Sequence, residues 1–304
     1  MLLTKRSTNN VSRRGPPLKI ALLPNLTRDA GGKITKEICD WLRTYGAEYA
    51  CQEEDRSVFA TVPEMNVLRF EDLIPWCDAI ITVGGDGSML RAAKMTVMYG
   101  KPLLCIGAGR LAFMAGLERD ELHLLKALID GEYWLDPRML LTVRLIRNGR
   151  VLQEENIIND VVVCRGSKVK IIDLDVFCDD RLINTYRADG VVVSTPTGSS
   201  AYCLAAGGPV LNPSMKGIVV TPICPQSLFA RSIVFSADNK LSIAINRESR
   251  SKDVVLSLDG GDSIKVMEGD ILSVERSEYA AKFIRIKNDP FFEILNNKLA
   301  GTEV

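Results

Sequence analysis

The stretch AIITVGGDGS, residues 79–88, decides how the first half of the chain folds. Its first five residues are apolar or β-branched and predict a buried strand, and the glycines that follow predict a tight turn. From Ser88 onward an amphipathic helical pattern runs to Gly100. A buried strand that turns directly into a helix is the repeating unit of parallel sheets, so this stretch indicates an α/β architecture.

The same alternation of strands and helices continues on both sides of this stretch. Apolar runs predict strands at residues 18–24 and 101–106, and helical spacing predicts helices at 33–45 and 119–131. We therefore expect an N-terminal α/β domain with a Rossmann-like parallel sheet.

After Arg138 the pattern changes to alternating β-branched residues separated by turn dipeptides. LTVRLIR at 141–147 runs into Asn148-Gly149, a dipeptide typical of a two-residue β-hairpin. This texture predicts a mostly antiparallel β C-terminal domain. The expected organisation is a flexible basic arm over 1–17, the α/β domain over 18–136, the β-rich domain over 137–287, and a C-terminal segment over 288–304 that packs back on the first domain and is helical over 290–298.

The charge balance argues against a nucleic-acid or membrane partner. The 304 residues include 38 Lys and Arg against 38 Asp and Glu, so the formal net charge is zero. Such a surface gives no overall electrostatic reason to bind DNA or an anionic membrane. No apolar run approaches the roughly 20 residues that a membrane helix needs. An anionic ligand must therefore be held by a local site.

His123 is the only histidine, and it lies away from the apolar stripe of its predicted helix. We expect it to be a solvent-exposed helix residue. Ser-His-Asp hydrolysis, Cys-His proteolysis and H-E-x-x-H zinc chemistry therefore have no histidine in a suitable place.

The eight cysteines form no C-x-x-C pair, and most lie in apolar runs. Buried thiols of this kind are typical of a reducing compartment, so we expect a cytoplasmic protein. The first 27 residues contain no acid and include Lys5, Arg6, Arg13 and Arg14. Organelle targeting by this segment is the alternative, but the segment lacks an apolar core and amphipathic spacing.

Glycines 84, 85 and 87 surround Asp86 at the predicted turn. Glycine lets backbone N–H groups approach a phosphate closely, and a helix N-terminus adds partial positive charge. A carboxylate in this place suits a kinase if it accepts a hydrogen bond from the hydroxyl that is phosphorylated. The alternative is an ordinary turn in which Asp86 or Ser88 caps the helix. The chain has no G-x-x-x-x-G-K-[ST] motif, which argues against a P-loop kinase.

A second glycine loop, GAGRLA at residues 107–112, follows the strand predicted at 101–106. It matches G-x-G-x-x-[GA], but its late position and the following FMAG at 113–116 do not fit a dinucleotide-binding βαβ unit. We expect a ligand loop in which Phe113 stacks on a base. The alternative is that Phe113 belongs to the core.

The stretch DGVVVSTPTGSSAY, residues 189–202, is the densest in polar groups. Its valines predict a strand that ends in a run of hydroxyl-bearing residues, Gly198 supplies flexibility, and Tyr202 combines an aromatic face with a hydroxyl. Such a segment can surround a ribose and its phosphates with small hydrogen-bond donors.

Together these segments resemble the ATP-dependent NAD kinase family. The resemblance covers about residues 18–279 and rests on GGDG at 84–87, Asn159-Asp160, residues 189–202, Gly207-Gly208-Pro209 and PICPQSLFAR at 222–231. It implies the two-domain fold described above, a phosphotransferase with an alcohol acceptor, and a homodimer or homotetramer.

The resemblance also implies the reaction and its residues. The 2′-hydroxyl of the adenosine ribose of NAD or NADH would attack the γ-phosphate of ATP, giving NADP or NADPH, with Mg²⁺ arriving with ATP and no separate metal site in the protein. Asp86 is implied as the catalytic residue that orients or deprotonates this hydroxyl. The implied binding residues are Gly85 and Gly87 for the phosphates, Phe113 for adenine, Asn159 and Asp160 for the ribose or nicotinamide side, Asp189 for the nicotinamide portion, and Thr197, Ser200, Ala201 and Tyr202 along the dinucleotide.

The chain departs from the family pattern at a few positions. Gln226 stands where the family has histidine, and Ser232 where it has proline. The family's G-x-L-G-F segment is here Gly109-Arg-Leu-Ala-Phe113, which introduces Arg110 and Ala112. We hypothesise that Arg110 binds a phosphate of the dinucleotide or of the donor. A solvent-facing arginine is the alternative.

Two other functions stay open at this point. A lipid or other small-alcohol kinase can share GGDG, but it gives no reason for the hydroxyl-rich run at 194–202. A non-catalytic dinucleotide sensor is favoured by Gln226 and the altered loop, and disfavoured by the intact Asp86. Incubation with ATP, Mg²⁺ and NAD or NADH, followed by measurement of NADP(H), separates the three.

Overall fold

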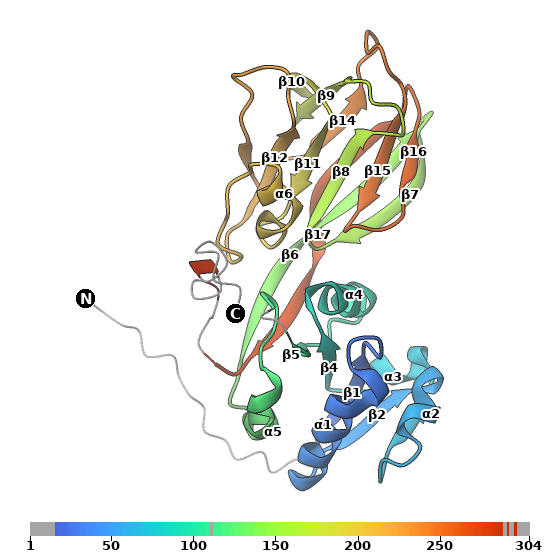
Figure 1. Ribbon diagram of the computed structural model, residues 1–304, viewed down its shortest axis with the longest axis vertical. Coiled ribbons are helices and arrows are strands. Elements are labelled where there is room, and N and C mark those ends of the chain that lie inside the picture. Colours follow the sequence, from blue (N-terminus) through green and yellow to red (C-terminus); the bar gives the residue numbers. More distant parts are fainter. Residues whose placement is uncertain (1–15, 110–111, 288–290, 292–294, 297–304) are drawn as a thin grey trace, which may run out of the picture. The chain divides into compact units, whose positions relative to one another are not determined.

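The computed structural model describes residues 16–109, 112–287, 291 and 295–296. The chain divides into two compact units, the first made of Met1–Pro137 with Ala281–Val304 and the second of Arg138–Ala280 (Figure 1). Most of the expected basic arm over 1–17 and most of the expected helix over 290–298 lie outside the described residues. Two long strands, β6 (Trp134–Arg147) and β17 (Ile271–Arg285), run through the two chain boundaries of these units.

The first unit is built on a parallel sheet, as the sequence predicts. Its strand order is β3-β2-β1-β4-β5, and Phe283 near the end of β17 pairs in parallel with Leu103 of β5. The strands β4 and β5 are buried along their whole length and β1 is buried between its end residues, which explains their continuous apolar sequences. The strands are β1 (Lys19–Pro24), β2 (Glu48–Gln52), β3 (Asn66–Leu68), β4 (Ala79–Gly84) and β5 (Leu103–Gly107).

Helices cover the sheet where the helical pattern is strongest. In α1 (Lys33–Thr44), Ile34, Ile38 and Leu42 face the same apolar core as β1, β4 and β5. The predicted helix at 119–131 is a 3₁₀ turn, Arg119–Leu124, followed by α5 (Leu125–Asp130), which ends at Gly131 with φ +78°. The shorter helices are α2 (Arg56–Phe59) and α3 (Phe70–Trp76), and α4 (Asp86–Thr96) follows β4 directly.

The second unit packs two antiparallel layers of strands against one another. One sheet has the order β13-β12-β11-β8-β15-β16, and the other layer has β10-β9-β14-β17, with β6 paired to β17 and β7 paired to β6. The strands are β7 (Arg150–Ile157), β8 (Asp160–Arg165), β9 (Ile172–Cys178), β10 (Arg181–Ala188), β11 (Gly190–Ser194), β12 (Gly217–Ile223), β13 (Ile233–Ser236), β14 (Leu241–Ile245), β15 (Val254–Leu258) and β16 (Ile264–Val266).

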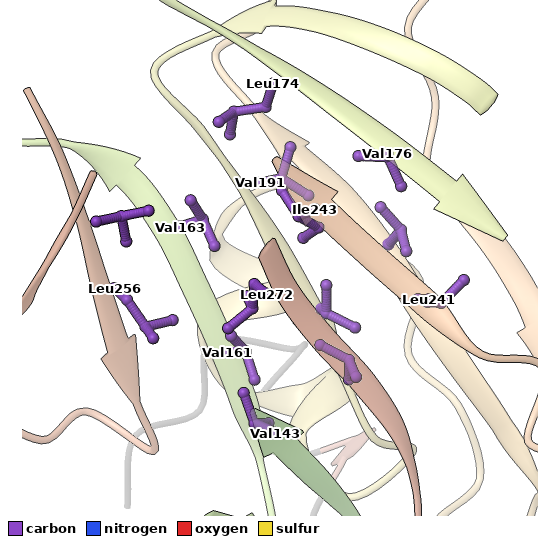
Figure 2. Packing of buried hydrophobic residues seen from close by; sticks show 14 of the residues in the cluster. Val143, Val161, Val163, Leu174, Val176, Val191, Leu241, Ile243, Leu256 and Leu272 are labelled. Carbon is purple, nitrogen blue, oxygen red and sulfur yellow. The ribbon is translucent and has the colours of Figure 1, made fainter. Parts of the chain in front are cut away.

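The core of the second unit lies between these layers. Figure 2 shows Val161, Val163 and Val191 of one layer facing Leu241 and Ile243 of the other, all of them buried. The predicted hairpin is confirmed: Arg147 pairs with Arg150, and Asn148 and Gly149 have φ of +48° and +73°, as a type I′ turn requires.

A second, smaller apolar cluster lies on the opposite face of the β11 sheet and fixes the segment after β11. Val192 and Val219 of the sheet pack there against Cys203 of the short helix α6 (Tyr202–Ala205) and against Leu211. Residues 195–211 are therefore held on this face of the sheet. Within the described residues, no helix combines the length and the apolar character needed to cross a membrane.

Candidate active site

The glycine motif of the first unit lies where β4 ends and α4 begins. Gly84 pairs with Gly107, and the N–H of Ala108 donates to the carbonyl of Gly84 at 3.1 Å. A Cβ on Gly84 would lie 2.6 Å from Ser88, so packing requires this glycine. The helix begins at Asp86, two residues before the predicted start, with Gly85 as N-cap and no side-chain cap. Neither carboxylate nor hydroxyl capping therefore explains the motif.

Gly85 and Gly87 have no such internal requirement. A Cβ on either residue would meet nothing within 4 Å, and neither has a left-handed backbone. Glycine in a helix costs about 0.5–1 kcal/mol relative to alanine. The fold alone would therefore favour alanine at Gly87, and the open space beside both residues suits a ligand at the N-terminus of α4.

The carboxylate of Asp86 is half-buried and is held by one of its oxygens. Oδ1 accepts a hydrogen bond from the N–H of Met114 at 3.0 Å. Within the described part of the chain, no hydrogen bond to Oδ2 is recorded. One oxygen thus fixes the orientation of the carboxylate, and the other can accept a hydrogen bond from a substrate.

Met114 lies just after the second glycine loop, and residues 112–118 contain no helix. The N–H of Gly107 donates to Leu117 at 2.9 Å, and the N–H of Gly116 donates to Cys105 at 2.8 Å. Phe113, next to Met114, is half-buried, and Ala112 is buried. Arg110, the proposed phosphate ligand, lies outside the described residues.

In the second unit, Asn159 lies in a bend and Asp160 is the first residue of β8, and hydrogen bonds to Asp259 and Thr195 hold this segment. The carboxylate of Asp259 accepts hydrogen bonds from the N–H groups of Ile158, Asn159 and Asp160 at 3.0, 2.8 and 3.2 Å. The N–H of Thr195 donates to the carbonyl of Asn159 at 2.9 Å. A Cβ on Gly198 would lie 2.1 Å from that carbonyl oxygen, so this glycine allows the two segments to approach.

Burial sets the ionisation of Asp160. Its side chain is buried, and loss of hydration together with the nearby charge of Asp259 raises its pKa to about 6, against a hydrogen bond from the backbone of Tyr202 that lowers it. The hydrogen bond from Tyr202 also places Asp160 beside the first residue of α6.

Most hydroxyls of the run after β11 are used inside the protein. Ser194 and Thr195 donate to backbone carbonyls, and Ser199 donates to Pro196 at 2.6 Å while accepting from the N–H of Leu211. The exception is Thr197, 8% exposed, whose Oγ1 is buried without a hydrogen-bond partner among the described residues. Such a group is expensive to bury, and it marks a place where a ligand can complete the hydrogen bonding.

The end of the same run is open to solvent. Ser200 donates to the carbonyl of Thr197 at 3.3 Å and is partly exposed, and Ala201 is exposed. Tyr202 is 47% exposed although it is aromatic. Asn159, Asp160, Thr197 and these three residues therefore form one neighbourhood in the second unit.

Asp189 lies apart from this neighbourhood. It precedes β11, whereas the hydroxyl run follows it, so five residues of extended strand, roughly 16 Å at about 3.3 Å per residue, separate the two. Its Oδ1 accepts a hydrogen bond from Nε of Arg165 at 2.9 Å. The structure thus places Asp189 at the other end of the strand.

The structure also shows the neighbours of Ser232 and Gln226, which differ from the family pattern. Oγ of Ser232 accepts a hydrogen bond from Thr221 at 2.9 Å, and Thr221 contacts Cys203 at 3.3 Å. Gln226 is exposed, and its backbone N–H donates to Arg187 at 2.9 Å.

The sequence analysis missed two groups that orient the site residues. The N–H of Met114 carries no side-chain signal, so no residue pattern points to it. Asp259 stands before Gly260-Gly261 with φ +49°, and an acid in a glycine turn is a signal that could have been followed. Among the described residues, no group of three or more His, Cys, Asp or Glu side chains could hold a metal ion.

Comparison with known proteins gives a consistent picture for both units. Residues 33–133 match the family model for the ATP-NAD kinase N-terminal domain, and residues 158–286 match the model for the ATP-NAD kinase C-terminal domain. An NAD kinase of Acetivibrio thermocellus is 33% identical over 283 residues, which cover 93% of this chain and 97% of that protein. An NAD kinase of Symbiobacterium thermophilum is 40% identical over 226 residues, covering 74% and 79%.

Solved structures share the fold. The crystal structure of yeast NADH kinase complexed with NADH aligns with a TM-score of 0.84 at 23% identity and covers 95% of this chain and 89% of that one. An NAD kinase from Archaeoglobus fulgidus in complex with ATP aligns with a TM-score of 0.67 at 24% identity, covering 93% and 99%.

Proposed function

This chain belongs to the ATP-NAD kinase family and phosphorylates NAD with ATP, and we propose that Asp86 is the residue that accepts the proton of the attacking hydroxyl. The hydroxyl is the 2′-hydroxyl of the adenosine ribose. Its oxygen bonds to the γ-phosphorus of ATP as the bond to the departing ADP oxygen breaks, and its proton passes to Oδ2 of Asp86. The products are NADP and ADP.

The geometry of Asp86 is the observation that carries this proposal. Its Oδ1 is fixed by Met114 at 3.0 Å, which orients the carboxylate before a substrate arrives. Its position at the first turn of α4, between two glycines with open space beside them, brings it next to where phosphates would be bound. Positioning and electrostatic stabilisation supply most of the catalysis in phosphoryl transfer, and the oriented carboxylate and the N-terminus of α4 support this role.

We propose that the second unit binds the dinucleotide. Asn159 and Asp160, held by Asp259, offer an amide and a carboxylate to ribose hydroxyls. The unpartnered Oγ1 of Thr197 can bond to the same ligand, and Tyr202 offers an exposed ring for stacking. Ser200 and Ala201 line this surface, Phe113 in the first unit packs on adenine, and Asp189 contacts the nicotinamide portion.

The reaction uses a divalent cation, and we propose that it is Mg²⁺ carried by ATP. Mg²⁺ ordinarily keeps several waters and is held by substrate phosphates with one or two carboxylates. The open space beside Gly85 and Gly87 at the N-terminus of α4 would admit the ATP phosphates that carry the cation. When bound, the cation neutralises phosphate charge.

We further propose a cytoplasmic location and a homodimer or homotetramer that acts on NAD or NADH. All eight cysteines are unpaired thiols, and five are buried, which fits a reducing compartment. Light scattering of the purified protein measures the oligomeric state directly.

The test of the function is incubation of the purified protein with ATP, Mg²⁺ and either NAD or NADH, with quantification of NADP(H). Formation of NADP(H) in proportion to ADP is the expected result. Tight binding of NAD without product would instead indicate a dinucleotide sensor. Absence of both binding and product would overturn the proposal and favour another small-alcohol kinase.

A further inference from the structure

A buried arginine contacts Met114, the residue whose N–H orients Asp86. Arg285, at the end of β17, is 3% exposed, and it belongs to the same unit as the glycine motif. Its Nη1 donates to the carbonyl oxygens of Met114 and Ala115 at 3.1 and 2.9 Å, and its Nε donates to Oδ2 of Asp136 at 3.2 Å. Asp136 is itself buried, so the ion pair is shielded from water.

Met114 links this arginine to the catalytic carboxylate through its own backbone. Its carbonyl accepts from Arg285, and its N–H donates to Asp86. The next residues of the loop are already tied to β5, because the N–H of Gly116 donates to Cys105 and a Cβ on Gly116 would lie 3.0 Å from the carbonyl of Ile284. Between Met114 and this anchored part, the contacts of Arg285 fix the carbonyls of Met114 and Ala115, and the N–H of Ala115 donates to the carbonyl of Ala112 at 3.4 Å.

Stability alone does not explain a charged pair at this place. Desolvation of two charges offsets most of their attraction, and apolar side chains of similar volume commonly stabilise a fold as well or better. A guanidinium differs because its rigid fork can hold two carbonyls and a carboxylate in one fixed arrangement. That is the set of partners that Arg285 has.

We infer that Arg285 is a positioning residue for phosphoryl transfer. It fixes the Met114–Ala115 backbone, so that the Met114 N–H holds Oδ1 of Asp86. Oδ2 is then left for the substrate hydroxyl that receives the phosphoryl group. Asp136 orients Arg285 in turn. This inference rests on the proposed role of Asp86. Arg285 is separated in the sequence from Met114 by 171 positions and from Asp136 by 149 positions.

The decisive variant is Arg285→Lys, which keeps the buried charge but cannot reach all three acceptors. We expect kcat to fall by about 10- to 100-fold, as small misplacements of catalytic groups do, while KM for NAD changes little. In an Asp86→Asn background the same substitution should cause little further loss, because it acts through Asp86. Hydrogen exchange of the Met114 amide should become faster in Arg285→Lys.

A matched control separates positioning from loss of stability. Leu42→Ala removes a buried side chain of α1 in the same unit and should lower the unfolding temperature with unchanged kcat of the folded protein. If Arg285→Lys does not fold, the double variant Asp136→Asn/Arg285→Met, which removes both charges of this ion pair, takes its place.

Two results would overturn the inference: an unchanged kcat in the folded variant, or an equal loss of kcat with and without Asp86. If the wild-type protein made no NADP(H), the proposed function would fail instead. The exchange rate of the Met114 amide would still show whether Arg285 holds the loop.

Discussion

Thr197 is a residue whose burial is explained by a ligand better than by the fold. Its Oγ1 has no partner among the described residues, whereas the neighbouring Thr195 hydroxyl donates to Ile158 and accepts from the N–H of Gly198. An unsatisfied buried hydroxyl costs about 1–3 kcal/mol. Two threonines two residues apart therefore differ: the hydroxyl of Thr195 holds the turn, and we propose that the hydroxyl of Thr197 bonds to the ligand.

Thr197→Val should separate stability from binding. Because the substitution removes an unsatisfied polar atom, the unfolding temperature should stay equal or rise. The Kd for NAD, measured by calorimetry, should increase by about fivefold, the value of one ordinary hydrogen bond. Thr195→Val is the matched control and should lower the unfolding temperature. NAD binding as tight as in the wild type would contradict the role of Thr197.

Asp160 predicts a specific dependence of stability on pH. Its pKa is raised to about 6 in the folded protein, first by burial and then by Asp259, above the usual 3.8. The folded state therefore holds a proton between about pH 4 and 6 that the unfolded state releases, so stability from this group is present below pH 4 and is lost as pH rises through 6. The loss amounts to about 3 kcal/mol.

Asp160→Asn removes this titration. The difference in free energy of unfolding between the variant and the wild type, measured in urea from pH 4.5 to 7.5, should shift in favour of the variant as pH rises and level off above about pH 6.5. A difference independent of pH would mean that Asp160 titrates normally.

Among the elements, α4 carries the clearest conflict between stability and function. It begins with Asp86 and Gly87, and the space beside Gly87 is open. A ligand phosphate at this helix N-terminus needs close approach to the backbone, which a side chain would obstruct.

Gly87→Ala should therefore stabilise the protein and impair the enzyme. We expect the free energy of unfolding to rise by up to about 1 kcal/mol and KM for ATP to increase, with KM for NAD less affected. Gly131→Ala is a useful control, because its φ of +78° should make that variant less stable without altering KM for ATP. An unchanged KM for ATP in Gly87→Ala would show that no phosphate approaches this residue.

The elements that could be predicted are those with long or unmixed patterns. The strand-turn-helix at 79–99, the strand at 18–24 and the hairpin at Asn148-Gly149 follow directly from apolar runs and turn chemistry. The strands β2 and β3 and the helix α3 were not assigned, since they are short and α3 contains Pro75. The strand β2 pairs with β1 and β3 pairs with β2, and no local pattern records these pairings.

The site divides in the same way between local and distant information. Asp86, its glycines and the hydroxyl run stand in contiguous motifs and could be singled out. The groups that orient them come from far along the chain: Met114 is 28 residues from Asp86, and Asp259 is 100 residues from Asn159. A backbone N–H and a distant carboxylate have no residue signature, so only the folded chain identifies them.

At the scale of the whole molecule, some of the residues that we propose for the reaction belong to the first unit and others to the second. Gly85, Asp86, Gly87 and Phe113 belong to the first, and the dinucleotide residues from Asn159 to Tyr202 belong to the second. The boundaries between the units fall inside β6 and β17, which run through them without a break. Continuous strands explain why no linker marks the division.

The most direct test of this account is the comparison of kcat and NAD affinity between the wild type and Asp86→Asn, with the exposed Asp72→Asn as control. The account predicts that the wild type forms NADP from NAD and ATP, that Asp86→Asn loses about 10²–10⁴-fold in kcat, and that its Kd for NAD stays close to the wild-type value. An Asp86→Asn variant that kept the wild-type kcat would contradict the central claim.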